Sequence, residues 1–104
     1  MITKDNFKDL LAKLGFSIKG DTFSKKFKET DAYLKVDFKA EKLIYPEDKG
    51  FTVNSTDTCN FRANENFVVF ECVHRLFEKG YEPKHIELEQ SYSKQPPLKT
   101  VALI

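Results

Sequence analysis

The feature that most constrains the fold of this chain is a change in the spacing of its apolar residues. Near the start and again over residues 65–79 they recur at i, i+3, i+4 and i+7, which is the spacing of one helix face. Between these segments, over residues 22–27 and 33–39, the side chains alternate with a period of two, as they do in half-buried strands. We therefore predict an α+β fold, with helices at 4–14 and 65–79 covering one face of a mainly antiparallel sheet built from residues 22–53.

Local signals refine these elements. Thr3 and Asn64 are the natural N-caps of the two helices. Residues 34–38 and 43–45 are separated by a short polar link, which predicts an antiparallel hairpin. Further short strands are predicted at 51–53 and 85–90.

Length and composition favour one domain. The chain has 104 residues, of which 40% are hydrophobic and 32% charged, enough for one core and too few residues for two. We assign residues 1–92 to a single α+β domain and 93–104 to an edge strand or flexible tail. No apolar run approaches membrane-spanning length and no secretion signal is recognisable, so we expect a soluble, cytoplasmic protein with no membrane partner and with Cys59 and Cys72 as free thiols.

The chain offers no complete catalytic or metal site. His74 and His85 belong to different elements, and neither has another His or a Cys at zinc-ligand spacing. The glycines are scattered at element ends and form no phosphate-binding loop. We predict no metal site and no cofactor in this chain, and we assign it no catalytic residue from composition or spacing.

A group of lysines is the main candidate for a binding surface. They lie on or beside the predicted strands and are interleaved with aromatic residues, a combination that suits nucleic-acid backbone: Lys25, Lys26, Lys28, Lys35 and Lys39. Lysines on the solvent side of a strand also prevent aggregation, and that role remains open. The formal net charge is only +1, so binding to DNA would be weak and independent of sequence.

Part of the chain resembles a known family. Residues 66–89 read NFVVFECVHRLFEKGYEPKHIELE, residues 34–38 read LKVDF and residues 43–47 read LIYPE. These three segments resemble in sequence the N-terminal region of large bacterial restriction–modification polypeptides. Those polypeptides are related to type I restriction subunits and to fused endonuclease–methyltransferases. The resemblance covers most of residues 3–90.

The resemblance implies a nuclease core of the PD-(D/E)xK type after such a region. There a helix glutamate, best matched here by Glu71, assists a metal held by a later Asp and a Glu-x-Lys triplet. Residues after Tyr92 contain neither, and the triplet at 47–49 precedes the helix in a turn, so Glu71 is at most a weak catalytic candidate.

Two functions therefore remain open. The first is an accessory module of a restriction–modification enzyme that positions DNA or braces its nuclease and methyltransferase domains, the isolated chain itself not being catalytic. Its partners would be DNA and the other domains or subunits of that enzyme. The second is a stand-alone cytoplasmic protein-interaction domain with no role on DNA.

Overall fold

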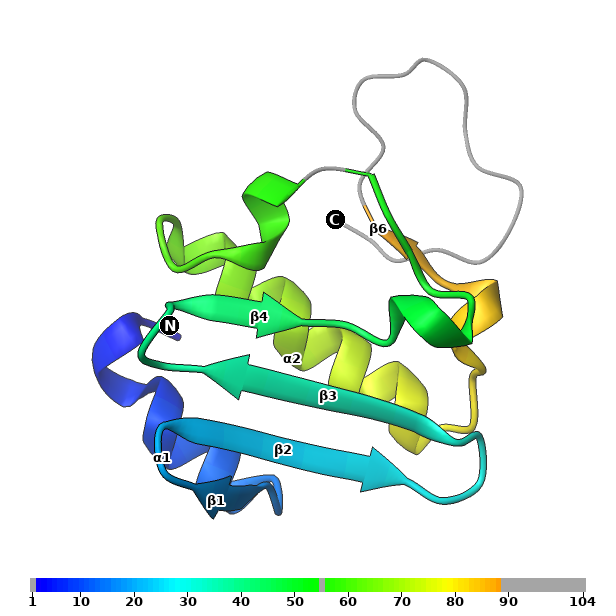
Figure 1. Cartoon of the computed structure of the whole chain (residues 1–104), viewed down its shortest axis with the longest axis horizontal. Coiled ribbons are helices and arrows are strands. Elements are labelled where there is room, and N and C mark those ends of the chain that lie inside the picture. The colour runs from blue at the N-terminus through cyan, green and yellow to red at the C-terminus, as the bar shows by residue number, and fades with distance from the viewer. Residues whose placement is uncertain (1, 55, 89–104) are drawn as a thin grey trace.

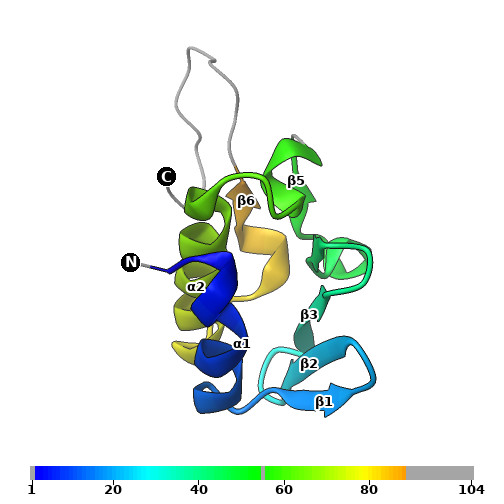
Figure 2. The same cartoon turned by 90° about the vertical axis from the view of Figure 1, so that its left-hand side faces the viewer.

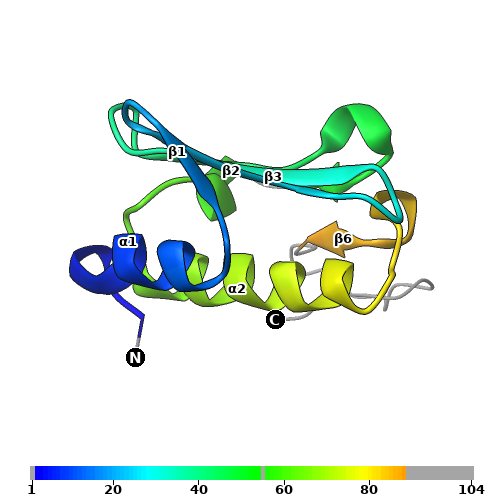
Figure 3. The ribbon, with the colours of Figure 1, turned by 90° about the horizontal axis from the view of Figure 1, so that it is seen from below.

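The fold has two layers, a four-stranded sheet and a pair of helices. The computed structural model describes residues 2–54 and 56–88 (Figure 1). Figures 2 and 3 show both helices on the same side of the sheet, so the predicted α+β fold class is confirmed. The elements are α1 (Lys4–Lys13), β1 (Ser17–Lys19), β2 (Thr22–Phe27), β3 (Ala32–Asp37), β4 (Lys42–Ile44), the 3-10 helix η1 (Glu47–Lys49), β5 (Thr52–Val53), η2 (Thr56–Cys59), α2 (Asn64–Glu78), η3 (Pro83–His85) and β6 (Glu87–Leu88).

The four main strands form an antiparallel meander in the order β1-β2-β3-β4. The predicted hairpin is confirmed, because Val36 pairs with Leu43 across β3 and β4. Its turn and the preceding one each contain a residue with positive φ, Glu41 at 56° and Asp31 at 61°. Short turns of this kind keep consecutive strands side by side.

The strand predicted at 51–53 was placed in the wrong sheet. β5 instead pairs in parallel with β6, with Val53 opposite Leu88. The strand predicted at 85–90 is also shorter within the described residues, because η3 occupies Pro83–His85 and leaves only Glu87–Leu88 extended. Residues 89–90, the predicted boundary at 92 and the tail 93–104 lie outside the described residues.

Both helices begin close to the predicted positions. Thr3 is the N-cap of α1 as predicted, and its backbone N–H donates to Asn6 Oδ1 at 2.9 Å. For α2 the prediction was wrong by one residue, since Ala63 is the N-cap. Asn60 stabilises the turn before α2, because its Oδ1 accepts the backbone N–H of Arg62 at 2.9 Å. Asn66 in the first turn of α2 donates to the Asn60 carbonyl oxygen at 3.1 Å, so this Asx turn is tied to the start of the helix.

Aromatic rings fill the space between the sheet and the helices. Phe7 of α1 lies 4.6 Å from Phe67 and 5.8 Å from Phe70, both on α2, between ring centroids. Phe70 also contacts Phe16 and Tyr45, at 6.1 and 5.5 Å. One aromatic core thus joins α1, α2 and the sheet and fixes which face of the sheet remains outside.

Candidate nucleic-acid interface

The outer face of the sheet, opposite the helices, is mostly polar, with Ile44 opposite Lys35 as an apolar exception. Because side chains alternate along a strand and the strand register is fixed, its rows can be assigned directly. Lys26 lies opposite Tyr33, and Ser24 lies opposite Lys35. A further row crosses all four strands through Lys19, Thr22, Asp37 and Lys42.

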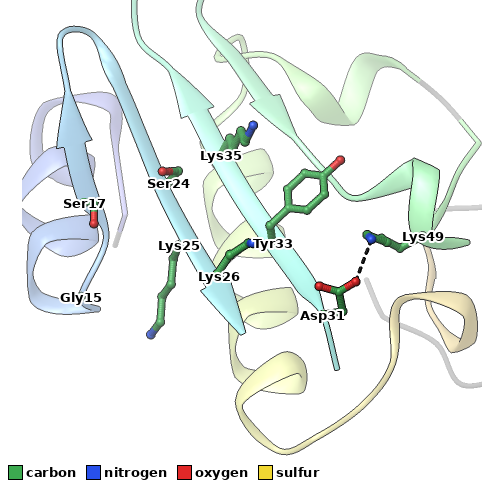
Figure 4. Close-up of a pocket in the computed structure, with 9 residues that line it drawn as sticks. All are labelled: Gly15, Ser17, Ser24, Lys25, Lys26, Asp31, Tyr33, Lys35 and Lys49. Carbon is green, nitrogen blue, oxygen red and sulfur yellow. Dashed lines mark hydrogen bonds and ion pairs between the residues drawn. The ribbon is translucent and has the colours of Figure 1, made fainter. Parts of the chain in front are cut away.

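A shallow depression of about 690 Å³ lies on this face (Figure 4). Strands β1, β2 and β3 supply its floor, and η1 with the turn after β2 supplies one rim. Its lining residues are Gly15, Ser17, Ser24, Lys25, Lys26, Asp31, Tyr33, Lys35 and Lys49. The volume falls within the roughly 300–1,000 Å³ range of ligand sites, although the depression is open.

The acidic groups of the rim are already engaged. Lys49 Nζ lies 2.7 Å from Asp31 Oδ2, and this cation holds the pKa of the Asp31 carboxyl below its usual value. The Tyr33 hydroxyl donates a hydrogen bond to Asp48, which raises the pKa of Tyr33 to about 12. Tyr33 therefore stays protonated at neutral pH, and its ring is anchored at the hydroxyl end.

Lys26 and Lys35 are the cations that this arrangement leaves available. Among residues 2–54 and 56–88, neither has an acidic group within ion-pair distance. Lys35 Nζ lies 5.2 Å from the centroid of the Tyr33 ring, a cation–π contact. The depression thus combines two available ammonium groups with one aromatic ring.

The five lysines predicted as one cluster do not share one surface. Lys26 and Lys35 lie together on the outer face, whereas Lys28 and Lys39 lie in the turns that follow β2 and β3, at opposite ends of the sheet. The side chain of Lys25 leaves β2 in a different direction from that of Lys26 (Figure 4). Alternation explains this difference, because consecutive residues of a strand point to opposite faces.

Lys25 instead joins β2 to both helices. Its Nζ donates to the carbonyl oxygen of Leu14 at 2.6 Å, contacts His74 Nε2 at 2.9 Å and reaches Glu78 Oε2 at 3.3 Å. An ammonium group has three N–H donors, and here each has an acceptor. The Lys25 side chain is 19% exposed, so the contacts form in a mostly buried setting.

The contact with Lys25 defines the protonation of His74. Because an ammonium group only donates, His74 Nε2 must accept, and the proton of the neutral ring is on Nδ1, 3.8 Å from Glu78 Oε1. His74 is 1% exposed and lies against Phe16 and Phe27. Burial, followed by the Lys25 charge, lowers the pKa of His74 against the weaker opposite effects of Glu78 and Glu71.

The lowered pKa of His74 predicts a loss of stability in mild acid. Below about pH 6.5 the unfolded chain takes up a proton at this residue that the folded chain does not, so the free energy of unfolding should decrease, by at most about 1.4 kcal/mol per pH unit. Above that pH the contribution is complete. Urea unfolding at about pH 7.5 and about pH 5.5 measures the difference.

The control is His74→Gln, which keeps an acceptor for Lys25 and does not titrate. Its stability should depend less on pH over the same interval than that of the wild type. The two proteins differ at no other ionisable group, so the comparison isolates His74. Equal pH dependence of the two proteins would contradict the assignment of a neutral, buried His74.

Glu71 lies in an ion pair on α2. Its Oε2 accepts the Arg75 Nε–H at 2.7 Å, the i,i+4 contact expected of a helix surface pair. Within the described part of the chain, no three His, Cys, Asp or Glu side chains are placed to hold a metal ion. Cys59 and Cys72 are free thiols, as predicted, and burial raises the pKa of Cys59.

Comparisons of the chain with protein-family models, with curated proteins and with solved structures gave no match. Neither helix within residues 2–54 and 56–88 has the length and apolar character needed to cross a bilayer.

The sequence reasoning missed two parts of this arrangement. It did not pair Tyr33 with Asp48, which reaches the ring from a separate turn. It also grouped Lys25 with the outer lysines, although Lys25 alternates in phase with Phe23 and Phe27. That shared phase was the available signal that Lys25 faces the core.

Proposed function

We propose that this chain is an accessory, cytoplasmic module of a DNA restriction–modification enzyme. It holds DNA backbone on the outer face of its sheet and braces the nuclease and methyltransferase parts. The observation that carries the proposal is the pair Lys26 and Lys35, which line a polar depression and form no ion pair among the described residues. The resemblance of residues 34–38, 43–47 and 66–89 to such enzymes supplies the cellular setting.

The charges of the outer face determine what kind of binding it supports. Lys19 and Lys42 lie at the two ends of the neighbouring row, with Asp37 beside Lys42, so an extended phosphate backbone that crosses this face meets further ammonium groups and one carboxylate. Each neutralised phosphate releases counterions, which makes binding dependent on salt and independent of sequence. With so few lysines the affinity is low, as suits a module that assists stronger contacts elsewhere in a large enzyme.

The test compares two double variants with the same change in charge. Lys26→Glu with Lys35→Glu should weaken binding of a labelled DNA duplex at low salt at least about tenfold, and should reduce the salt slope by about 2, because two phosphate contacts are lost. Lys28→Glu with Lys39→Glu is the control, since these lysines lie in opposite turns. Fluorescence anisotropy over a salt series measures both quantities.

The outcomes separate the two functions that the sequence left open. Equal weakening by the two double variants would mean that total charge, and not the outer face, determines binding. Unchanged binding by the Lys26/Lys35 variant would remove this surface from consideration. Absence of any binding by the wild type would favour the stand-alone protein-interaction domain.

A further inference from the structure

Tyr33 lies next to the two available cations of the outer face, Lys26 and Lys35. It lies directly opposite Lys26 in the strand register, and Lys35 lies two residues further along the same strand. Its hydroxyl is anchored to Asp48 of η1, so the ring is held in one place above the sheet. Figure 4 shows the ring between the lysine side chains and the rim formed by Asp31 and Lys49. A fixed aromatic ring beside two ammonium groups is a platform for a flat ligand that carries negative charge.

The form of the depression selects among nucleic acids. In a duplex the bases are stacked on one another inside the double helix. Only the backbone of a duplex would therefore reach the Tyr33 ring in the depression. Elements that read duplex DNA project into a groove, as a helix or a two-stranded ribbon does. In a single strand the bases are free to stack on aromatic side chains while the backbone follows a positively charged groove. The outer face has both of these components.

We infer that the depression binds single-stranded DNA, with a base stacked on Tyr33 and the flanking phosphates on Lys26 and Lys35. This inference rests on the proposed function and specifies its substrate. In the free protein Lys35 Nζ lies over the Tyr33 ring. Base stacking replaces that weak exposed cation–π contact and releases the ammonium group to pair with a phosphate.

The rim sets the limits of the site. Asp31 is paired with Lys49, and Asp48 accepts the Tyr33 hydroxyl, so both carboxylates are engaged within the fold. The Asp31 carboxyl, whose pKa is lowered, is negatively charged at neutral pH and repels phosphate. The backbone of the bound strand therefore runs over Lys26 and Lys35 and away from the end of the depression formed by η1.

The experiment uses the full chain with a labelled thymidine oligonucleotide and with a duplex of equal length, both at low salt. We expect the single strand to bind more tightly than the duplex. Tyr33→Leu should weaken single-strand binding about tenfold and weaken duplex binding by a smaller factor, because only an unpaired base can stack on the ring. Tyr33→Phe is the matched control, since it keeps the ring and should retain single-strand binding. Circular dichroism melting checks that both variants fold.

The results separate this inference from the proposed function. If Tyr33→Leu binds the single strand as the wild type does, while Lys26→Glu with Lys35→Glu weakens it, the inference fails and the proposed function stands. Tighter binding of the duplex than of the single strand would also overturn the inference alone. If the wild type binds neither oligonucleotide, both fail.

Discussion

Replacement of Phe70 by alanine is expected to lower the free energy of unfolding by about 3–5 kcal/mol, the loss that follows removal of a large buried aromatic ring. Phe70 is 0% exposed and lies where the two layers meet. Its ring contacts Phe7, Phe16 and Tyr45, so the cavity borders α1, the segment after it and the sheet at once. Rings held from several elements cannot easily move in to fill that space.

Urea unfolding followed by circular dichroism measures this effect. Val68→Ala on the same helix is the control, because Val68 is 38% exposed and its truncation should cost about 0.5 kcal/mol or less. An m-value equal to that of the wild type would indicate that unfolding exposes the same amount of surface in the variant as in the wild type. If Phe70→Ala were no more destabilising than Val68→Ala, the placement of the core between sheet and helices would be wrong.

Replacement of Lys25 by methionine should cost about 2–3 kcal/mol, although it removes no large apolar group. The variant keeps a long side chain but leaves the Leu14 carbonyl and His74 Nε2 without their donor in a mostly buried setting. An unsatisfied buried acceptor costs about 1–3 kcal/mol. Glu78 is half exposed and can return to water, so its loss adds little.

Lys26→Met is a closely matched control for this prediction. The substitution is the same, the residue is adjacent, and its side chain lies on the outer face. We expect its free energy of unfolding to change by no more than about 0.5 kcal/mol. Equal losses in the two variants, measured by urea unfolding, would contradict a structural role for Lys25.

The fold was largely predictable because its main elements have a strong period. The helical spacing around Phe7 and Phe70 predicts two helices with one buried face each. The alternation in β2 and β3 predicts two strands with one buried face each. The structure confirms both predictions. The parallel pair β5–β6 was not predictable, because two residues carry no period and their partners lie far apart in the sequence. The missed N-cap has a similar cause, since Asn60 acts from outside the helix.

The candidate site was predicted less well than the fold. Lysines near one another in the sequence were grouped together, whereas alternation places Lys25 and Lys26 on opposite faces. The partners of Lys25 come from the end of α1 and from α2, and no local pattern joins these segments. Tyr33 likewise gains its anchor only when η1 folds back beside β3.

The cluster formed by Lys25, His74 and Glu78 also bears on how the strands align. A slip of two residues between β2 and β3 leaves the alternation of apolar and polar positions unchanged, so hydrophobic burial alone distinguishes poorly between the two alignments. After such a slip, Phe23 or Phe27 would occupy the position of Lys25, and the Leu14 carbonyl and His74 Nε2 would have no donor. The polar contact therefore disfavours the misaligned pairing and favours the observed register of β2 against β3.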